Sequence, residues 1–167
     1  MNIKNEKCKQ ETEKREYKIK NIEYKIKDKE INMKKFARQS DAIMTQIVLH
    51  SHINGSGRLF GGQLMSWMDI TGAICAKRHA ECNVVTARVD RIDFFYPAMP
   101  NDIVVVSATI CGVGNTSMKV CVSANVENFS NKKETKKICS ATFTFVAIDE
   151  NGKKYSVPKL ADLDWLI

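Results

Sequence analysis

Residues 52–78 of the chain read HINGSGRLFGGQLMSWMDITGAICAKR. The segment opens with a glycine-rich turn and becomes the most apolar run of the sequence, whose spacing predicts a helix over residues 61–79. Asp69 is the only acid in that helix, and small or apolar residues lie three and four positions from it on the same face. Because a carboxylate in such surroundings is costly unless it has a partner, Asp69 is the first candidate for a functional residue.

One strand is predicted before this helix and four after it. Runs rich in Val, Ile, Thr and Phe define the strands, and Gly, Pro, Asn and Asp separate them. The predicted strands are residues 42–50, 84–96, 103–113, 117–128 and 138–148. Long strands joined by short turns predict an antiparallel meander.

The helix decides how this sheet must fold. Its apolar residues point in most directions, so it has to be buried on more than one side. We therefore predict an α+β domain in which a five-stranded antiparallel sheet wraps one long central helix. The sheet edges and the remaining helix face would still need cover, which self-association would provide.

Length and composition exclude several classes of protein. A chain of 167 residues is expected to form one domain with a sizeable core. It has no apolar run of about 18 residues, so no membrane insertion is expected, and its charged N-terminus lacks the apolar part of a secretory signal. We expect a cytoplasmic protein, with organellar targeting left open. The six cysteines show no CxxC spacing and are expected to be reduced and mostly buried, and the three histidines indicate no metal site.

Positive charge is concentrated at the N-terminus. The net charge is +7, of which residues 1–35 carry +5 and residues 36–167 carry +2. Because positive and negative charges nearly cancel in residues 36–167, the domain is not expected to bind nucleic acid. Apolar residues recur every seven positions in residues 1–35 and predict a charged helical extension, either a solvated helix or a contact for an oligomer or a membrane surface. Residues 36–160 form the predicted domain, and residues 161–167 form a C-terminal tail.

The order of motifs in the domain resembles the hotdog-fold acyl-CoA thioesterases. The first motif joins Asn54, Gly57, Gly61-Gly62 and Asp69. Three others follow in the family's order, VTARVDRIDF at 85–94, GVGNTSM at 112–118 and TFVAID at 144–149. The resemblance implies a hotdog fold and hydrolysis of acyl-CoA to free fatty acid and CoA, without a metal ion or a further cofactor. It also implies a homodimer, which in many family members assembles into a trimer of dimers.

The resemblance further implies an active site at the dimer interface, in which Asn54 of one subunit faces Asp69 of the other. Asp69 would act as general base or as nucleophile. The first N–H groups of the helix, at Gly61 and Gly62, have no intrahelical partner and suit a thioester oxygen that develops negative charge. Asn54 could donate to the same oxygen or position the water. Each residue also has a purely structural interpretation. Asp69 could bond a neighbouring backbone group, Gly61 and Gly62 could only make a tight entry turn, and Asn54 could belong to a plain Asn-Gly turn.

A second group of residues is expected to bind the substrate. By resemblance, residues 112–117 form the CoA loop and Thr86 lies near the thioester. The basic side chains of Arg88, Arg91 and Lys119 could also meet the CoA phosphates. The predicted contacts are Gly61, Thr86, Arg88, Arg91, Gly114, Asn115, Thr116 and Ser117. The alternatives are an ordinary hairpin turn and arginines that face outward into solvent.

Other enzyme classes fit the sequence less well. It contains no GxSxG motif, which excludes a thioesterase of the α/β-hydrolase type. Positions four and five after Asp69 are Ala73 and Ile74, so the Asp–His pair of hotdog hydratases is missing. The alternative function is a non-catalytic acyl-CoA-binding hotdog module, against which the presence of both Asn54 and Asp69 argues.

Overall fold

The structure is a computed structural model that describes residues 14, 17–20, 34–127 and 135–161. The chain divides into two compact units, residues 1–34 and 35–167, and the fold below is that of the second unit. Of the predicted N-terminal helix, only residues 14 and 17–20 are described, and they are helical. The rest of that prediction, and residues 162–167 of the predicted tail, lie outside the described residues.

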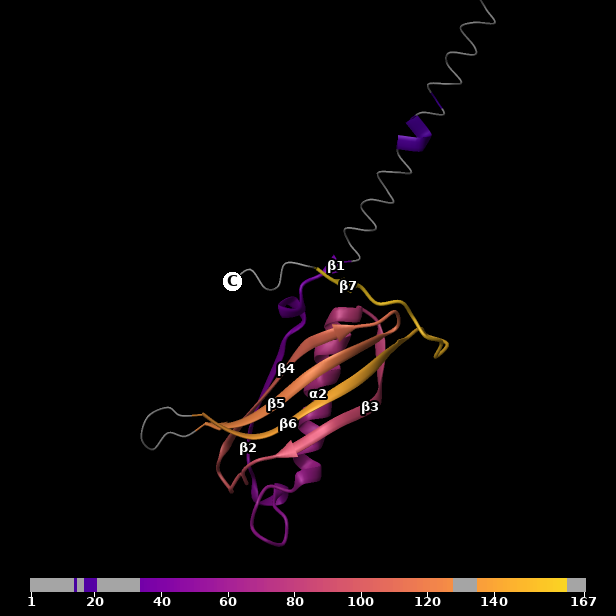
Figure 1. Cartoon of the computed structure of the whole chain (residues 1–167). Coiled ribbons are helices and arrows are strands. Elements are labelled where there is room, and N and C mark those ends of the chain that lie inside the picture. Colours follow the sequence, from indigo (N-terminus) through magenta and orange to yellow (C-terminus); the bar gives the residue numbers. More distant parts are fainter. Residues whose placement is uncertain (1–13, 15–16, 21–33, 128–134, 162–167) are drawn as a thin grey trace, which may run out of the picture. The chain divides into compact units, whose positions relative to one another are not determined.

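One long helix packs against a five-stranded antiparallel sheet (Figure 1). Helix α2 spans Gly61–Ala80. The strands of the sheet are β2 (Ala42–Ile47), β3 (Asn83–Phe94), β4 (Ile103–Val113), β5 (Ser117–Glu127) and β6 (Thr135–Ile148). Short elements flank them: 3₁₀ helices at Ala37–Ser40 and His50–His52, and a pair of two-residue strands, β1 (Lys34–Lys35) and β7 (Lys159–Leu160). The predicted fold class, one long helix wrapped by five antiparallel strands, is confirmed.

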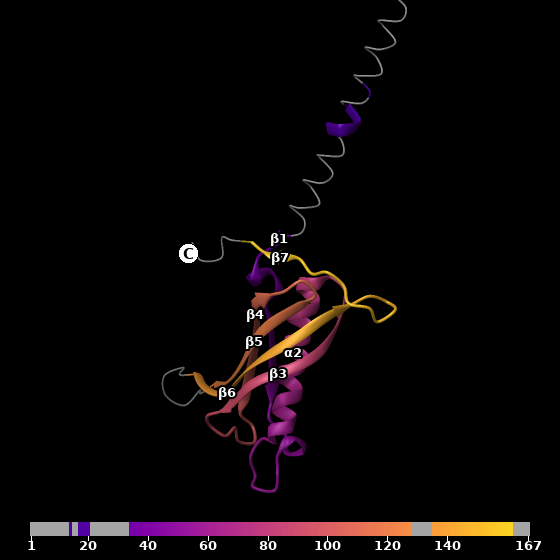
Figure 2. The same ribbon diagram turned by 45° about the vertical axis from the view of Figure 1, so that its right-hand side comes forward.

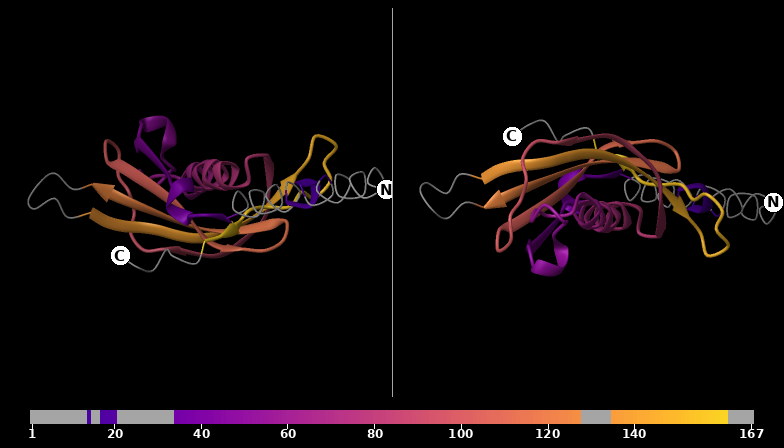
Figure 3. Two further views of the ribbon diagram at one scale, coloured as in Figure 1. Left: turned by 90° about the horizontal axis from the view of Figure 1, so that it is seen from above. Right: turned by 90° about the horizontal axis from the view of Figure 1, so that it is seen from below.

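The sheet covers one side of the helix. Figure 3 shows α2 on one face of the sheet, and Figure 2 shows the strands running across it. The buried side chains of α2 recur every three or four residues and include Leu64, Met68 and Cys75. They meet buried side chains at alternate positions of β4, β5 and β6. Each large side chain buried in this way contributes about 1.5–3 kcal/mol, so packing holds α2 to the sheet.

Gly72 allows the helix to lie close to β6. A Cβ atom at this position would lie 3.1 Å from Cε2 of Phe145, which is itself fully buried. Such a distance is tighter than ordinary van der Waals contact, so a larger residue would push α2 away from the sheet. The glycine in the middle of the helix therefore has a packing role.

The strand order differs from the predicted meander. The order in the sheet is β2-β4-β5-β6-β3, so β4, β5 and β6 form a meander while β3 pairs with β6 at the far edge. The prediction that successive strands pair was wrong for β3 and β4. Residues 95–102 connect β3 to β4. These eight residues are long enough to span the three inter-strand spacings, about 14 Å in total, that separate the two strands. The two strands that flank α2 in sequence thus become the two edges of the sheet.

The last turn of α2 ends at a left-handed residue and carries a buried histidine. Glu81 has φ 55°, and its N–H donates to the Lys77 carbonyl at 2.9 Å. His79 is fully buried, with Nδ1 3.2 Å from the Ser40 hydroxyl and Nε2 3.0 Å from the Pro158 carbonyl. Burial lowers the pKa of His79 below its ordinary value. The ring thereby links α2 to segments before β2 and after β6.

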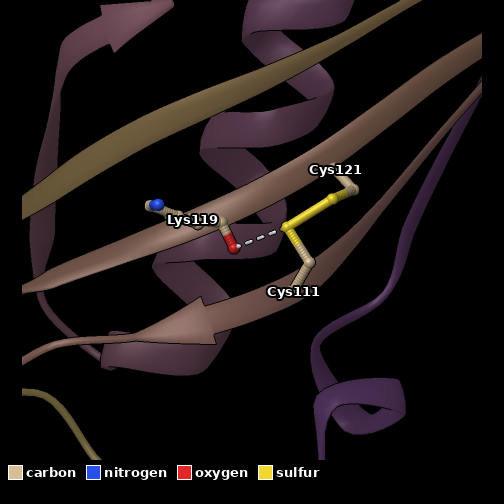
Figure 4. Close-up of a disulfide and its surroundings, with 3 residues drawn as sticks. All are labelled: Cys111, Lys119 and Cys121. Atoms are coloured by element: carbon tan, nitrogen blue, oxygen red, sulfur yellow. Dashed lines mark hydrogen bonds between the residues drawn. A yellow bond between two sulfur atoms is a disulfide. The ribbon is translucent and has the colours of Figure 1, made fainter. Parts of the chain in front are cut away.

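The expectation that all cysteines are reduced was wrong for one pair. Cys111 and Cys121 form a disulfide with a Cα–Cα distance of 5.8 Å (Figure 4). They lie on neighbouring strands, and both face outward because they occupy exposed alternate positions of β4 and β5. The hairpin turn midway between Cys111 and Cys121 brings the two cysteines together. A search for CxxC spacing does not detect a pair of cysteines on neighbouring strands. Cys75 and Cys139 are free and buried, as predicted, and Cys82 is free and half-buried.

The described part of the chain leaves the face of α2 opposite the sheet uncovered. Ile70 is 45% exposed and Ile74 39% exposed, although both lie in the most apolar segment of the sequence. The predicted burial on more than one side is therefore not reached within one chain. No described helix is long and apolar enough to span a membrane.

Candidate active site

Asp69 is held by a residue of the edge strand. The Thr86 hydroxyl on β3 donates a 2.7 Å hydrogen bond to Oδ1 of Asp69 in the middle of α2. Asp69 is half-buried, and its Oδ2 has no hydrogen-bond partner within the part of the chain that the structure describes. A carboxylate oriented through one oxygen and open at the other can accept a proton from a bound water or attack a carbonyl carbon.

Asn54 is presented by a small closed loop. Ile53 and Leu59 form an isolated bridge, and the Asn54 N–H donates to the Arg58 carbonyl at 2.8 Å. The side-chain oxygen of Asn54 accepts from the N–H groups of Ser56 at 2.9 Å and Arg58 at 3.3 Å. These bonds fix the side-chain amide by its oxygen, so its NH₂ end points away from the loop N–H groups and is available as a donor. The Asn-Gly turn and the presentation of a donor therefore occur together.

The loop leads directly into the start of α2. Phe60 precedes the helix in an extended conformation, no side chain caps the first turn, and that turn contains no acidic residue. The first N–H groups of the helix, at Gly61 and Gly62, therefore remain without side-chain partners and carry the positive end of the helix dipole. The Phe60 ring lies over Gly62 so closely that a Cβ atom there would collide with it. The missing Cβ atoms thus leave room for the Phe60 ring beside Gly62 and for the Phe94 ring, 3.6 Å from the Cβ position at Gly61, next to N–H groups suited to an anionic oxygen.

The single chain contains two half-sites. One consists of Asn54 with the start of α2, and the other of Asp69 with Thr86. Asp69 lies eight residues after Gly61, which corresponds to about 12 Å along the helix axis. No hydrogen bond or ion pair joins Asn54 to Asp69 among the described residues. Within one chain, the structure joins Asp69 to Thr86 by a hydrogen bond, whereas Asn54 bonds residues of the loop that leads into α2.

The predicted CoA loop is a hairpin turn tied down by the C-terminal segment. The Gly114 N–H donates to the Ser117 carbonyl at 2.7 Å. Three carbonyl groups of the turn also accept hydrogen bonds: Gly114 from Lys159 Nζ at 2.7 Å, Asn115 from the Val157 N–H at 3.0 Å and Thr116 from the Ala147 N–H at 3.0 Å. Since three of its carbonyls and the Gly114 N–H are already bonded, the groups of the turn left for a ligand are its other N–H groups and the hydroxyls of Thr116 and Ser117.

This turn lies at the same end of the sheet as Thr86. In the sheet register, Thr86 on β3 faces Phe145 on β6, and Phe145 faces Met118 on β5. The turn that begins β5 therefore lies two strand spacings, about 10 Å, from the strand of Thr86. That separation is one an extended substrate can bridge.

Arg88 and Arg91 are exposed beside two bulges of β3. The register shifts between Thr86 and Arg88 and between Asp90 and Asp93, and Arg91 has φ 46° within the second shift. Arg88 forms an ion pair with Asp90, and Arg91 Nε lies 3.4 Å from Asp93 Oδ2. Both arginines are exposed, which agrees with the outward-facing alternative, and their contact with CoA phosphates stays a prediction.

A cavity of about 240 Å³ adjoins the start of α2. Its apolar lining includes Leu64 and the end of β3 with the residues after it, Phe94, Phe95 and Tyr96, and Gly61 forms part of the wall. Sequence reasoning missed these aromatic residues. The run FFYP at 94–97 was the available signal, since three successive aromatic residues at a strand end are unusual in a solvated turn.

Histidine takes no part in this arrangement. The His52 ring packs edge-on against Trp67 with a centroid distance of 5.2 Å, and its Nδ1 accepts from the Leu49 N–H at 3.2 Å. Among residues 34–127 and 135–161, no group of three or more His, Cys, Asp or Glu side chains is placed to hold a metal ion. The polar groups of the two half-sites are a carboxylate, a hydroxyl, an amide and backbone N–H groups.

Comparisons with known proteins agree with this geometry. Residues 56–128 match the model of the thioesterase superfamily. An uncharacterised acyl-CoA thioester hydrolase of Haemophilus influenzae is 35% identical over 129 residues, which cover 75% of this chain and 84% of that protein. The acyl-CoA thioester hydrolase YciA of Escherichia coli is 34% identical over 122 residues, which cover 72% of this chain and 92% of that protein.

Solved structures show the same fold. An acyl-CoA hydrolase of Staphylococcus aureus in complex with butyryl-CoA, CoA and CoA disulfide has a TM-score of 0.73 and 32% identity, covering 76% of this chain and 77% of that one. A hexameric acyl-CoA thioesterase has a TM-score of 0.74 and 32% identity, covering 77% of this chain and 81% of that one.

The Staphylococcus aureus protein was also studied with three single alanine substitutions, of an Asn, an Asp and a Thr. The positions of the three substituted residues in that protein are 15 and 17 residues apart. Asn54, Asp69 and Thr86 have the same two separations in this chain.

Proposed function

The chain belongs to the thioesterase superfamily, and from this premise we propose that it hydrolyses acyl-CoA thioesters to a free fatty acid and CoA. The observation that carries the proposal is the 2.7 Å hydrogen bond by which Thr86 orients the half-buried carboxylate of Asp69. A structural Asp would be expected to use both oxygens, whereas Oδ2 here has no partner among the described residues. The acyl-CoA hydrolases to which the chain is similar support the choice of substrate.

Asp69 has two possible roles in the reaction. As a general base it takes a proton from a water that attacks the thioester carbon, and the C–S bond then breaks to release CoA as a thiol. As a nucleophile it forms a mixed anhydride with the acyl group and expels CoA, and water then hydrolyses the anhydride. Thr86 holds the carboxylate in position in either case. The first role requires room for a water at Oδ2, and the second requires direct contact with the substrate.

The start of α2 supplies the stabilisation of negative charge. The tetrahedral carbon formed by attack carries an oxyanion, which suits the uncapped N–H groups of Gly61 and Gly62 and the NH₂ group of Asn54. Donors that are already fixed in a loop and a helix need no reorganisation when the charge develops. Such a site would tolerate different acyl chains, because the charge appears at the thioester in all of them.

The complete site is proposed to form between two subunits. Asn54 and Asp69 belong to separate half-sites within one chain, and a second copy would bring one half-site against the other. Exposed apolar side chains at Ile70 and Ile74 on α2 and at Val85 and Phe94 on the edge strand β3 support such an association. Solved relatives described as hexameric agree with assembly of such dimers.

The same separations of 15 and 17 residues support the assignment of Asn54, Asp69 and Thr86 to one reaction. Chemistry that depends on these three types of side chain needs them at fixed places on the loop, the helix and the first strand after it. The three positions in this chain meet that requirement through the hydrogen bonds described above.

The test is a direct assay of the full-length protein. It is incubated with acyl-CoAs from short to long chain length, and released CoA is measured with a chromogenic thiol reagent. Turnover with at least one chain length, lost in Asp69→Ala with unchanged circular dichroism, supports the proposal. Binding of acyl-CoA without turnover at any chain length would instead establish the alternative, a non-catalytic acyl-CoA-binding module.

A further inference from the structure

The Cys111–Cys121 disulfide is exposed on the face of the sheet that points away from α2. Both cysteines occupy exposed positions, on neighbouring strands. The bond closes a hairpin that contains the turn of Gly114–Ser117, and Cys111 lies at the shift in register between Ile110 and Gly112. A disulfide on an exposed surface is open to attack by soluble thiols.

The other described cysteines are poor competitors for such chemistry. Burial raises the pKa of the Cys75 thiol to about 12 and that of Cys139 to about 11. Burial also raises the pKa of Cys82, which is half-buried. Since the thiolate is the reactive form, these three thiols are poor nucleophiles. The Cys111–Cys121 disulfide is therefore the group of the described domain at which exchange with a soluble thiol is expected.

A groove lies beside one of the two sulfurs. Its volume is about 650 Å³, and Cys121 is part of its wall, whereas Cys111 is not. The neighbouring lining is polar and includes hydroxyl groups on three strands, at Thr109, Ser123 and Thr142. Charges of both signs complete it, from Arg91 and Lys137 and from Asp41 and Asp93. The groove has room for the polar body of a small molecule whose thiol reaches Cys121.

We propose that the Cys111–Cys121 disulfide is a thiol-exchange site, at which a low-molecular-weight thiol carried by the groove forms a mixed disulfide with Cys121. The incoming thiolate attacks Sγ of Cys121, the Cys111–Cys121 bond breaks, and Cys111 leaves as a thiolate that takes a proton from water. A second thiol can then attack the mixed disulfide. That step yields the reduced protein dithiol and a disulfide of the two small thiols, so two thiols are oxidised while one protein disulfide is reduced.

The surroundings of Cys111 can hold the released thiol in its protonated form. Its Sγ lies 3.5 Å from the Lys119 carbonyl oxygen, which can accept the proton of the thiol once the disulfide is open (Figure 4). The Lys119 ammonium group points away from the disulfide in the same view. The attacked sulfur is Cys121 because the groove reaches Cys121 and not Cys111, and the thiol released at Cys111 has an acceptor in place.

CoA is the thiol that the proposed reaction would supply. This choice of thiol rests on the proposed function, while the exchange itself does not. Each turnover would release one CoA thiol close to a protein that carries an exposed disulfide. The redox state of the disulfide would consequently depend on the local ratio of free CoA to CoA disulfide. The disulfide joins the two strands that hold the Gly114–Ser117 turn.

The experiment begins with full-length protein isolated under air, incubated with CoA or with cysteamine, which offers a thiol without the nucleotide. Intact mass and peptide mapping locate the adduct. In Cys111→Ser and Cys121→Ser, the remaining thiol is trapped with CoA disulfide, which prevents the second exchange. Cys82→Ser is the matched control that keeps the disulfide, and Cys111→Ser/Cys121→Ser removes it. Hydrolysis of acyl-CoA by the double variant is measured in parallel.

Either a CoA adduct on the peptide of Cys121 or the reduced Cys111/Cys121 dithiol that the second exchange yields is expected in the wild type and in Cys82→Ser, and neither on this hairpin in the double variant. Cys111→Ser should be trapped several-fold faster than Cys121→Ser, and CoA should react faster than cysteamine. A disulfide that stays intact without any adduct, an adduct that persists unchanged in the double variant, trapping mainly at Cys111, or equal rates with the two thiols would overturn the proposal. If neither the wild type nor any variant hydrolyses acyl-CoA, the proposed function is contradicted, while the location of the adduct and the trapping rates still test the exchange.

Discussion

The Thr86 hydroxyl donates a 2.7 Å hydrogen bond to Oδ1 of Asp69, so the first strand after the helix orients the carboxylate at the middle of that helix. The bond leaves Oδ2 for the substrate or for water. Asp69→Asn keeps the shape of the side chain and removes the negative charge. We expect kcat to fall by roughly 10²–10⁴-fold, the range for loss of a general base. Steady-state kinetics measure this fall, and activity near the wild-type value would contradict the assignment.

Thr86 is expected to act through Asp69. Thr86→Val preserves the shape and removes the donor, so the carboxylate loses a bond worth about 1.5–3 kcal/mol. We expect kcat to fall about tenfold or more, while Thr86→Ser, which restores the hydroxyl, recovers most of the rate. A mainly structural role would lower the melting temperature of Thr86→Val without this rescue. Kinetics and thermal denaturation of both variants distinguish the two roles.

The start of α2 offers a test of the oxyanion site. In Gly62→Ala the new Cβ tilts toward the helix N-terminus and stands over the free N–H groups, and it also collides with the Phe60 ring. We expect kcat to fall at least about tenfold, since a single lost oxyanion donor costs 10²–10³-fold in other enzymes.

The double variant Gly62→Ala/Phe60→Ala separates the two effects of that methyl group. Phe60 is 56% exposed, so its removal relieves the collision at little cost to the core. Stability should return to that of Phe60→Ala, while kcat should stay low. Recovery of kcat in the double variant would show that displacement of Phe60, rather than blocked access to the N–H groups, caused the loss.

Much of the fold could be predicted because periodicity reports which side of an element is buried. The helix and the five strands all appear within a few residues of their predicted bounds. The pairing of β3 with β6 could not be predicted in this way, because the connection of residues 95–102 is long enough for either neighbour. Alternation of apolar residues also does not reveal the two bulges of β3, each of which adds a residue without changing the composition.

The sequence allowed the residues of the candidate site to be predicted, but not the contacts between them. Asn54, the glycines and Asp69 stand out as a motif, and the resemblance placed Thr86 near the thioester. The sequence could not show that Thr86 bonds Asp69, since that contact depends on the register of β3 against the rest of the sheet. The exposed disulfide was missed for a related reason. It becomes visible only when Cys111 and Cys121 are placed on facing strands of one hairpin.

The buried His79 should make stability depend on pH. Burial lowers its pKa in the folded state below the ordinary value of 6.5, so in that pH range the unfolded chain binds more protons. The contribution of His79 is fully present above pH 6.5 and is lost as the pH falls from 6.5 toward the folded pKa. The charged neighbours are Lys35, which lowers the pKa, and Glu81, which raises it.

Urea denaturation between pH ~8 and ~5 measures this loss, with a slope of at most about 1.4 kcal/mol per pH unit for one group. His79→Gln should flatten the dependence in this range. Ser40→Ala is the matched control, because it removes the 3.2 Å contact and keeps the titrating ring. A slope that is the same in His79→Gln would assign the dependence to other groups.

The division of the site into two half-sites predicts complementation between inactive variants. Asn54→Ala and Asp69→Ala should each be inactive as homodimers, because every site then lacks one of the two residues. A mixed dimer is different if Asn54 of one subunit works with Asp69 of the other. Both substitutions then fall in one site, and the second site contains both native residues.

Random mixing by co-refolding or co-expression makes half of the dimers mixed, each with one intact site of two, so about a quarter of the wild-type activity per chain should return. Mixing each variant with itself gives the baseline. Ile74→Arg, introduced into both chains, should abolish the recovery by placing a charge on the exposed apolar face of α2. If Asn54 and Asp69 of the same chain formed each site, the mixture would remain inactive at every ratio, and the site would have to close within one subunit.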